Sequence, residues 1–179
     1  MRFYVFDDSD SKYKMILDHN TFNDLVWNES DRNVAYESSG AYSSNQVLIS
    51  EYNWDSSLGP TVLTTAEVNA ITGRENFDPT NFGDKTYYFD SLSAYQEATS
   101  QGASAYAWLY NYTDGCIRNG CDYEDPNTNS YWLKEPRGPV NGGTDVRVIN
   151  YEGRIYYYEA YHNYSGVRPV ITVLQSVFE

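Results

Sequence analysis

The sequence has no long apolar segment and few basic residues. No run approaches the roughly 20 apolar residues of a membrane-spanning helix, and the first residues, MRFYVFDD, lack the basic start and apolar stretch of a signal peptide. Twelve Lys and Arg against 25 Asp and Glu give a formal net charge of -13. Because this charge disfavours nucleic acid and anionic membrane surfaces, we expect neither nucleic-acid binding nor direct membrane insertion by this segment.

Cysteine is equally scarce, with only Cys116 and Cys121 in the stretch DGCIRNGCDYED. Gly115 and Gly120 allow the backbone to turn tightly enough to bring the two sulfurs together. We therefore favour a disulfide-closed loop over two free thiols, which implies an oxidising compartment. A structural zinc site needs four ligands, and neither histidine has ligand-like spacing to the cysteines, so zinc is not expected.

Catalytic motifs are missing as well. The sequence contains no Gly-x-Ser-x-Gly elbow, no phosphate-binding loop and no His-Glu-x-x-His helix. Its two histidines, His19 and His162, have no serine or cysteine of suggestive context beside them. The sequence therefore predicts a protein that is not an enzyme.

The length of 179 residues is typical of one domain, and we expect a single domain over residues 1–179. The segments RFYVF and KYKMILD are rich in β-forming residues and are separated by DDSDS, a run of turn-forming residues, which predicts an N-terminal hairpin. Residues 28–45 are polar and have no clear period, so we interpret residues 28–58 as a loop-rich insert.

The clearest helix begins in the segment LTTAEVNAITG. Thr64 suits the N-cap, and Glu67 three residues later completes a capping box. Leu63 and Val68 occupy the positions of a hydrophobic staple, and Gly73 suits the C-terminal stop. A weaker helical pattern covers SLSAYQEATSQ, and the aromatic block SAYAWLYNY follows it, with Trp108 and Leu109 expected in the core.

An acidic stretch, CDYEDPNTN, follows the second cysteine. It concentrates oxygen-bearing side chains of the kind that bind calcium: Asp122, Glu124, Asp125, Asn127 and Asn129. A solvated acidic turn explains the same residues without a metal, and we favour that interpretation. The run DDSDS at residues 7–11 has the same ambiguity and is the weaker calcium candidate, since a hairpin turn already explains it. No other cofactor is expected.

The last fifty residues predict an antiparallel sheet. Its expected strands are SYWLKEP, DVRVI, RIYYYEAY and VRPVITVLQ, separated by the turn-forming runs RGPVNGG, NYEG and HNYSG. The final strand is apolar on both faces, which predicts a buried strand with Pro169 near its start. Arg168 enters this strand directly after a glycine turn. A buried guanidinium needs acceptors, either a carboxylate or backbone carbonyls, so we predict a structural role for Arg168.

Nineteen tyrosines are present, and they are dense between Asn150 and Tyr164. On a strand, Tyr156 and Tyr158 share one face and Tyr157 takes the other. The rings fill a core in the structural interpretation and form a recognition surface in the functional one, which we favour. The predicted ligand-binding residues are Tyr151, Tyr156, Tyr158, Tyr161, His162, Asn163 and Tyr164.

Five elements in fixed order carry a resemblance to a known family: FYVFDDSDSKYKMILDHN, VLTTAEVNAITG, YAWLYNYTDGCIRNGC, YWLKEP and NYSGVRPVITV. Together they resemble a large family of bacterial domains that is abundant in gut Firmicutes and closes with Gly-Val-Arg-Pro and an apolar strand. The resemblance implies an α+β fold of the C-type lectin-like kind shared with formylglycine-generating enzymes, with short helices, an antiparallel sheet and long irregular loops. It also implies secreted or membrane-tethered surface proteins, some with pilin-like anchors.

These observations predict a non-enzymatic ligand-binding or adhesion module at the bacterial cell surface, tethered through a region outside this sequence. Its partner is expected to be a protein or a carbohydrate. The alternative is a structural pilus or surface-assembly subunit whose tyrosines mediate assembly. The C-terminal stretch resembles that of lectin-like proteins diversified by retroelements, which is also rich in Tyr, Asn, Ser and Asp. This resemblance adds the hypothesis of a diversified receptor.

Overall fold

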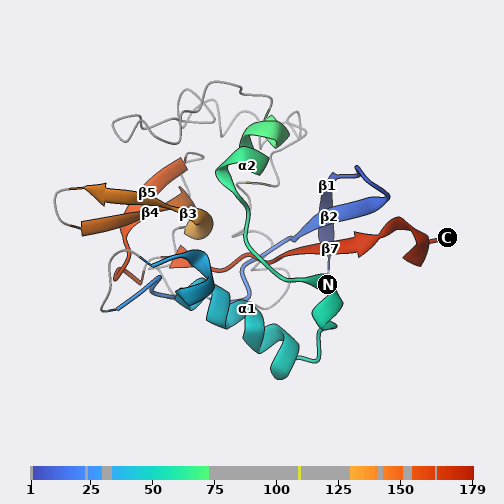
Figure 1. Ribbon diagram of the computed structural model, residues 1–179, viewed down its shortest axis with the longest axis horizontal. Helices are drawn as coiled ribbons and strands as arrows, with labels where there is room; N and C mark the ends of the chain where they lie inside the picture. The colour runs from blue at the N-terminus through green and yellow to red at the C-terminus, as the bar shows by residue number, and fades with distance from the viewer. Residues whose placement is uncertain are drawn as a thin grey trace.

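The computed structural model describes residues 2–22, 24–29, 34–72, 109, 130–140, 143–150, 155–163 and 165–179. Its elements in chain order are β1 (Phe3–Asp7), β2 (Lys12–Leu17), η1 (Tyr36–Ser38), α1 (Gly40–Ser50), η2 (Ser56–Leu58), α2 (Thr65–Thr72), β3 (Ser130–Val140), β4 (Gly143–Asn150), β5 (Ile155–Glu159), β6 (Ser165–Gly166), β7 (Val170–Leu174) and η4 (Gln175–Val177). Short helices accompany two small sheets, so the described chain has the predicted α+β class (Figure 1).

The predicted N-terminal hairpin is confirmed. Strands β1 and β2 pair antiparallel, with Val5 opposite Met15. The turn between them contains Asp10 and Ser11 in the left-handed region, at φ of 54° and 58°. Asp7 accepts a hydrogen bond from the backbone N–H of Ser9 at 3.0 Å, and hydrogen bonding by Ser9 lowers the pKa of Asp7. Turn chemistry therefore accounts for the run DDSDS.

The final strand does not belong to the C-terminal sheet, and this part of the prediction was wrong. Strand β7 pairs antiparallel with β2, with Ile171 opposite Met15, and completes a three-stranded sheet of order β1-β2-β7. Figure 1 shows β7 running beside β2 and away from β4 and β5. Only the first half of β7 is fully buried, because Val170 and Ile171 lie in the core while Leu174 is exposed.

The other strands form a four-stranded sheet of order β5-β4-β3-β6. It is antiparallel as predicted, except that the short β6 pairs parallel to β3, with Ser130 opposite Ser165. The predicted turn RGPVNGG is too wide, because β3 continues to Val140 and β4 begins at Gly143. The pairing passes Pro136 with shifts of register on both sides, as expected where a proline interrupts a ladder.

Helix α1 was not predicted, because it lies inside the region interpreted as a loop-rich insert. Ser39 caps it by accepting a hydrogen bond from the backbone N–H of Tyr42 at 3.1 Å. The buried positions of α1 are Ala41, Ser44, Asn45 and Leu48. Half of this face is polar, so the sequence shows no apolar period. The side chain of Asn45 donates a hydrogen bond to the Tyr36 hydroxyl at 2.9 Å, and burial raises the pKa of Tyr36.

Helix α2 begins with the predicted capping box. The Glu67 carboxylate accepts from the backbone N–H of Thr64 at 2.8 Å, and the Thr64 hydroxyl accepts from the backbone N–H of Glu67 at 3.1 Å. Both staple residues, Leu63 and Val68, are buried in one cluster. Glu67 also accepts from Lys14 Nζ at 2.9 Å, and this bond raises the pKa of Lys14. The carboxylate of Glu67 therefore joins the helix start to the three-stranded sheet.

Replacing Glu67 with alanine is expected to lower the free energy of unfolding by about 1 kcal/mol, because both the helix cap and the contact with Lys14 are lost. Urea titration followed by circular dichroism measures the change. Glu51→Ala is the matched control, since Glu51 is an exposed glutamate at the end of α1. Equal effects of the two substitutions would contradict a specific role for Glu67.

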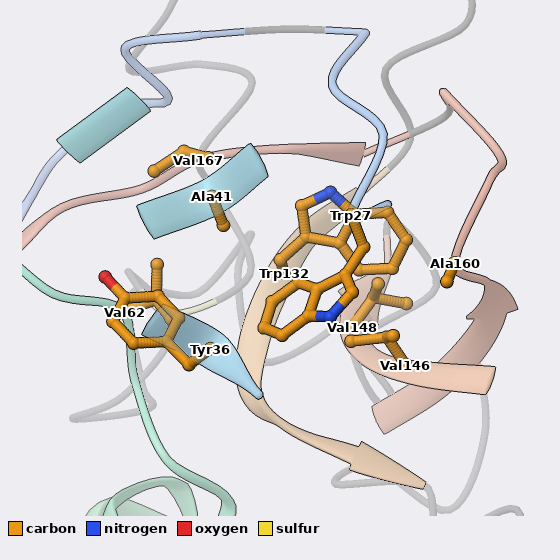
Figure 2. Packing of buried hydrophobic residues seen from close by; sticks show 9 residues of the cluster. All are labelled: Trp27, Tyr36, Ala41, Val62, Trp132, Val146, Val148, Ala160 and Val167. Atoms are coloured by element: carbon orange, nitrogen blue, oxygen red, sulfur yellow. The ribbon is translucent and has the colours of Figure 1, made fainter. Parts of the chain in front are cut away.

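Buried side chains form two clusters. One packs α2 against both sheets and contains Ile16, Leu63, Val68, Leu109, Tyr131, Leu133, Ile149 and Val170. The other contains Trp27, Tyr36, Ala41, Val62, Trp132, Val146, Val148, Ala160 and Val167, and Figure 2 shows its two indole rings side by side. Burial of Leu109 was predicted and is confirmed, whereas Trp108 and the helical pattern at 91–101 lie outside the described residues.

The described helices are short. Within the ranges that the structure describes, none is long and apolar enough to cross a membrane.

Candidate ligand-binding surface

Two of the predicted ligand-binding tyrosines, Tyr156 and Tyr158, pack against the hydrophobic core. Tyr156 lies opposite Val148 and Tyr158 opposite Val146, so the two tyrosines share a face of the sheet, as the strand pattern predicted. Both rings are half-buried and pack against the cluster that contains Trp132. Each of these two rings therefore has one part that fills the core and another part that a ligand could contact.

The turn after β5 presents the exposed part of the surface. Tyr161 is 44% exposed, and its hydroxyl donates to Glu159 Oε2 at 2.5 Å. His162 Nε2 lies 3.2 Å from the same carboxylate oxygen. The Tyr161 and His162 rings meet edge to face, with their centroids 4.8 Å apart. Asn163 follows on the exposed side of the turn. One carboxylate thus orients two neighbouring aromatic side chains.

Ring contacts also extend along β5. The Tyr156 and Tyr157 rings stack with centroids 4.9 Å apart and planes at 6°, and the Tyr156 and Tyr158 rings meet at 5.5 Å. We call Tyr156, Tyr157, Tyr158, Glu159, Tyr161 and His162 the β5 aromatic surface. Among the described strands, β5 lies at one edge of the four-stranded sheet. The surface therefore combines half-buried rings on the strand with the exposed ring of Tyr161 and the half-buried ring of His162 on the turn.

Glu159 and Tyr157 were missing from the predicted site. A single acidic residue in a tyrosine-rich run has no pattern of its own, so Glu159 gave no clear signal. Its position two residues before Tyr161 was the available clue, since a strand that ends in a turn brings such neighbours together. The strand pattern places Tyr157 only on the opposite face, and its stacking on Tyr156 depends on the actual ring positions.

A buried residue anchors the turn from below. Ala160 is 1% exposed and belongs to the cluster of Trp27 and Trp132. Its carbonyl accepts a hydrogen bond from the backbone N–H of Asn28 at 2.9 Å. The backbone N–H of His162 donates to the carbonyl of Glu159, also at 2.9 Å, and closes the turn. The rings of Tyr161 and His162 therefore lie on a fixed backbone, as a preformed binding surface requires.

Arg168 lies in the position expected for a structural arginine. It is 0% exposed, Nε donates to the Leu17 carbonyl at 2.6 Å, and Nη1 donates to the Leu109 carbonyl at 3.1 Å. Its guanidinium also lies 5.4 Å from the centre of the Tyr131 ring. The acceptors are backbone carbonyls, one of the two alternatives that the sequence left open.

The other predicted positions cannot be placed. Tyr151, Tyr164, the two cysteines and the predicted calcium ligands Asp122, Glu124, Asp125 and Asn127 lie outside the described residues. The disulfide and the calcium site therefore stay predictions. Among the residues that are described, no three His, Cys, Asp or Glu side chains gather closely enough to hold a metal ion.

Residues 62–175 match the family model described as a domain of unknown function (DUF6273). The chain belongs to this family. No curated protein and no solved structure matches the chain. The DUF6273 match contains α2, the four-stranded sheet, the β5 aromatic surface and β7, whereas β1, β2 and α1 precede it.

Proposed function

We propose that this DUF6273 protein is a non-enzymatic ligand-binding or adhesion module of a bacterial surface protein, and that its ligand binds at the β5 aromatic surface. The observation that carries the proposal is the exposed ring of Tyr161 beside the half-buried ring of His162, both held by Glu159 next to the buried Ala160. Rings held in this way lose little conformational entropy when a ligand binds.

The chemistry of the surface suits recognition of a partner. A tyrosine ring offers a flat apolar face and a polar tip, and Asn163 adds an adaptable hydrogen-bonding group. The half-buried rings of Tyr156 and Tyr158 provide a firm base because they pack on the core. A protein or a carbohydrate is therefore the ligand class that we propose.

The fold and location belong to the same proposal. We propose a C-type lectin-like arrangement and a cell-surface setting, on the resemblance carried by the Gly-Val-Arg-Pro segment and the four elements that precede it. In support, the two small sheets and short helices form an α+β domain. The diversified-receptor hypothesis places variable residues on this same surface, and sequencing of sibling copies from one genome tests it.

Screening of the purified protein on glycan and protein arrays, with and without calcium, identifies the ligand. Tyr161→Ala is then expected to weaken binding by more than about 1 kcal/mol, roughly fivefold or more, with an unchanged melting temperature. Tyr52→Ala is the matched control, because Tyr52 is 63% exposed and belongs to the turn after α1. Isothermal calorimetry and thermal denaturation provide the two readouts.

Tyr156→Ala separates the two parts of the surface. Because this ring packs on the core, we expect the substitution to lower the melting temperature as well as the affinity. Equal binding by the wild type and the Tyr161→Ala variant would place the ligand elsewhere.

Assembly of copies is the second candidate function. The observation in its favour is the exposed apolar group at the end of β7, which consists of Leu174, Val177 and Phe178. Light scattering distinguishes the two functions. A monomer that binds an array ligand favours recognition, whereas self-association that is lost in Tyr161→Ala or Phe178→Ser favours assembly.

A further inference from the structure

The region that matches DUF6273 begins at residue 62, yet two strands of the three-stranded sheet and members of both core clusters lie upstream. Strand β2 is the central strand of its sheet, between β1 and β7. Trp27, Tyr36 and Ala41 belong to the cluster that supports the β5 aromatic surface. A unit limited to residues 62–175 would therefore lack the partner of β7 and one side of this core.

The upstream contacts follow one antiparallel course along the described residues of both segments. Strand β2 pairs with β7 from Lys12 opposite Leu174 to Ile16 opposite Val170. From the end of β2 onward, backbone N–H groups of residues 17, 21, 25 and 28 donate to the carbonyls of residues 169, 167, 165 and 160, at 2.8–2.9 Å. The N–H of Val167 returns a bond to the carbonyl of Phe22. The described residues of segment 12–28 thus pair with residues 165–174, and Asn28 also bonds to Ala160.

Buried side chains also connect the DUF6273 region to the upstream segment. Trp132 Nε1 donates to the Leu25 carbonyl at 2.8 Å, and Arg168 Nε donates to the Leu17 carbonyl at 2.6 Å. The Trp27 and Trp132 rings meet edge to face, with centroids 5.8 Å apart (Figure 2). The DUF6273 region therefore supplies donors that need the upstream backbone as acceptor, and an unpaired buried donor is costly.

We infer that residues 160–174 form a strand-accepting surface whose occupant is the upstream segment 12–28 of the same chain, and that the DUF6273 region does not fold without it. The occupant has a defined chemistry: an extended segment whose backbone groups can pair, an apolar face and a tryptophan that fills the space beside Trp132. It also holds the turn of Tyr161, through the bond from Asn28 to Ala160.

Cleavage of the folded full-length chain tests this inference. A protease site is inserted after Gly59, which is exposed, adopts a φ of 53° and would have no neighbouring atom within 4 Å of a β-carbon added there. After cleavage, fragments 1–59 and 60–179 are expected to co-elute in native gel filtration and to melt in one transition. Separation into a soluble 60–179 fragment that still melts cooperatively would overturn the inference.

A variant pair sharpens the test. In the cleaved protein, Trp27→Ala is expected to weaken the association of the fragments more than about tenfold, because its ring fills one side of a buried cluster. Tyr52→Ala, on the same fragment, is expected to leave the association unchanged because Tyr52 is exposed. Equal association of both variants would also overturn the inference. All readouts concern folding and association, so they stand whether or not the β5 aromatic surface binds a ligand.

Discussion

Arg168→Ala is expected to lower the free energy of unfolding by about 3–5 kcal/mol, because two backbone carbonyls lose a charged donor and the fully buried side chain leaves a large cavity. The carbonyls of Leu17 and Leu109 each lose a donor, and the face of the Tyr131 ring loses its cation. At the usual scaling for a chain of this length, the melting temperature falls by roughly 10 °C.

Two further variants separate the causes of this loss. Arg168→Lys keeps the positive charge but replaces the planar fork with one ammonium, which cannot reproduce the directed donors to both carbonyls. We expect an intermediate stability. Lys12→Ala removes an exposed positive charge from β2 and is expected to change little. An unchanged melting temperature of Arg168→Ala, combined with lost ligand binding, would instead assign Arg168 to a binding site.

The contacts of Arg168 also connect distant parts of the chain. Tyr131 donates its hydroxyl to the Leu109 carbonyl at 2.7 Å, the same carbonyl that accepts from Arg168. Arg168 bonds at the same time to Leu17 at the end of β2. One side chain therefore joins the N-terminal hairpin to Leu109 and to the ring on β3. This triple role explains why we expect a larger effect than for an ordinary surface arginine.

Local patterns in the sequence predicted local structure well. The capping box at Thr64 and Glu67 and the turn at Asp10 and Ser11 depend on residues close in sequence, so their signals are complete within a short window. Helix α1 was missed because Ser44 and Asn45 occupy its buried face. Their burial is possible only through partners such as Tyr36, which the helix sequence does not contain.

Choice of strand partner could not be predicted in the same way. The alternation in VRPVITV indicates a strand but carries no information about whether β2 or β3 lies beside it. The tyrosine-rich segment likewise indicated a surface, but its sequence did not show which rings are half-buried and which are exposed. Tyr158 is half-buried and Tyr161 exposed because Ala160, between them, is fixed to Asn28. That difference arises from a contact between residues far apart in the chain.

Gly166→Ala is the second substitution with a large expected effect. A β-carbon at this position would lie 2.4 Å from Asn20 Nδ2 and 2.5 Å from the carbonyl oxygen of Phe22. Neither neighbour moves easily, because the Phe22 carbonyl accepts from the N–H of Val167 and Asn20 is buried. Overpacking of this kind costs about 1–3 kcal/mol or more, and we expect the upper part of that range.

The substitution acts where residues 12–28 meet residues 160–174, so its consequence should reach the turn of Tyr161. Gly59→Ala is the control for loss of a glycine, since its φ of 53° causes strain while no neighbouring atom lies within 4 Å of the added carbon. We expect a cost of about 1 kcal/mol there. Adding Asn20→Gly to Gly166→Ala removes one of the two clashing groups and should recover part of the stability, despite the loss of the bond from Asn20 to Ser130.

Chemical denaturation of the five proteins, the wild type, the two single alanine variants, Asn20→Gly and the double variant, gives the required differences. If the Gly166→Ala variant were as stable as the Gly59→Ala variant, the segment at Asn20 and Phe22 would have to relax away from the added methyl group. A double variant with no recovery beyond the cost of Asn20→Gly alone, measured in the wild-type background, would place the whole cost on the Phe22 carbonyl. In that case the backbone pairing of Val167 with Phe22, and not the packing of Asn20, requires glycine in the Gly-Val-Arg-Pro segment.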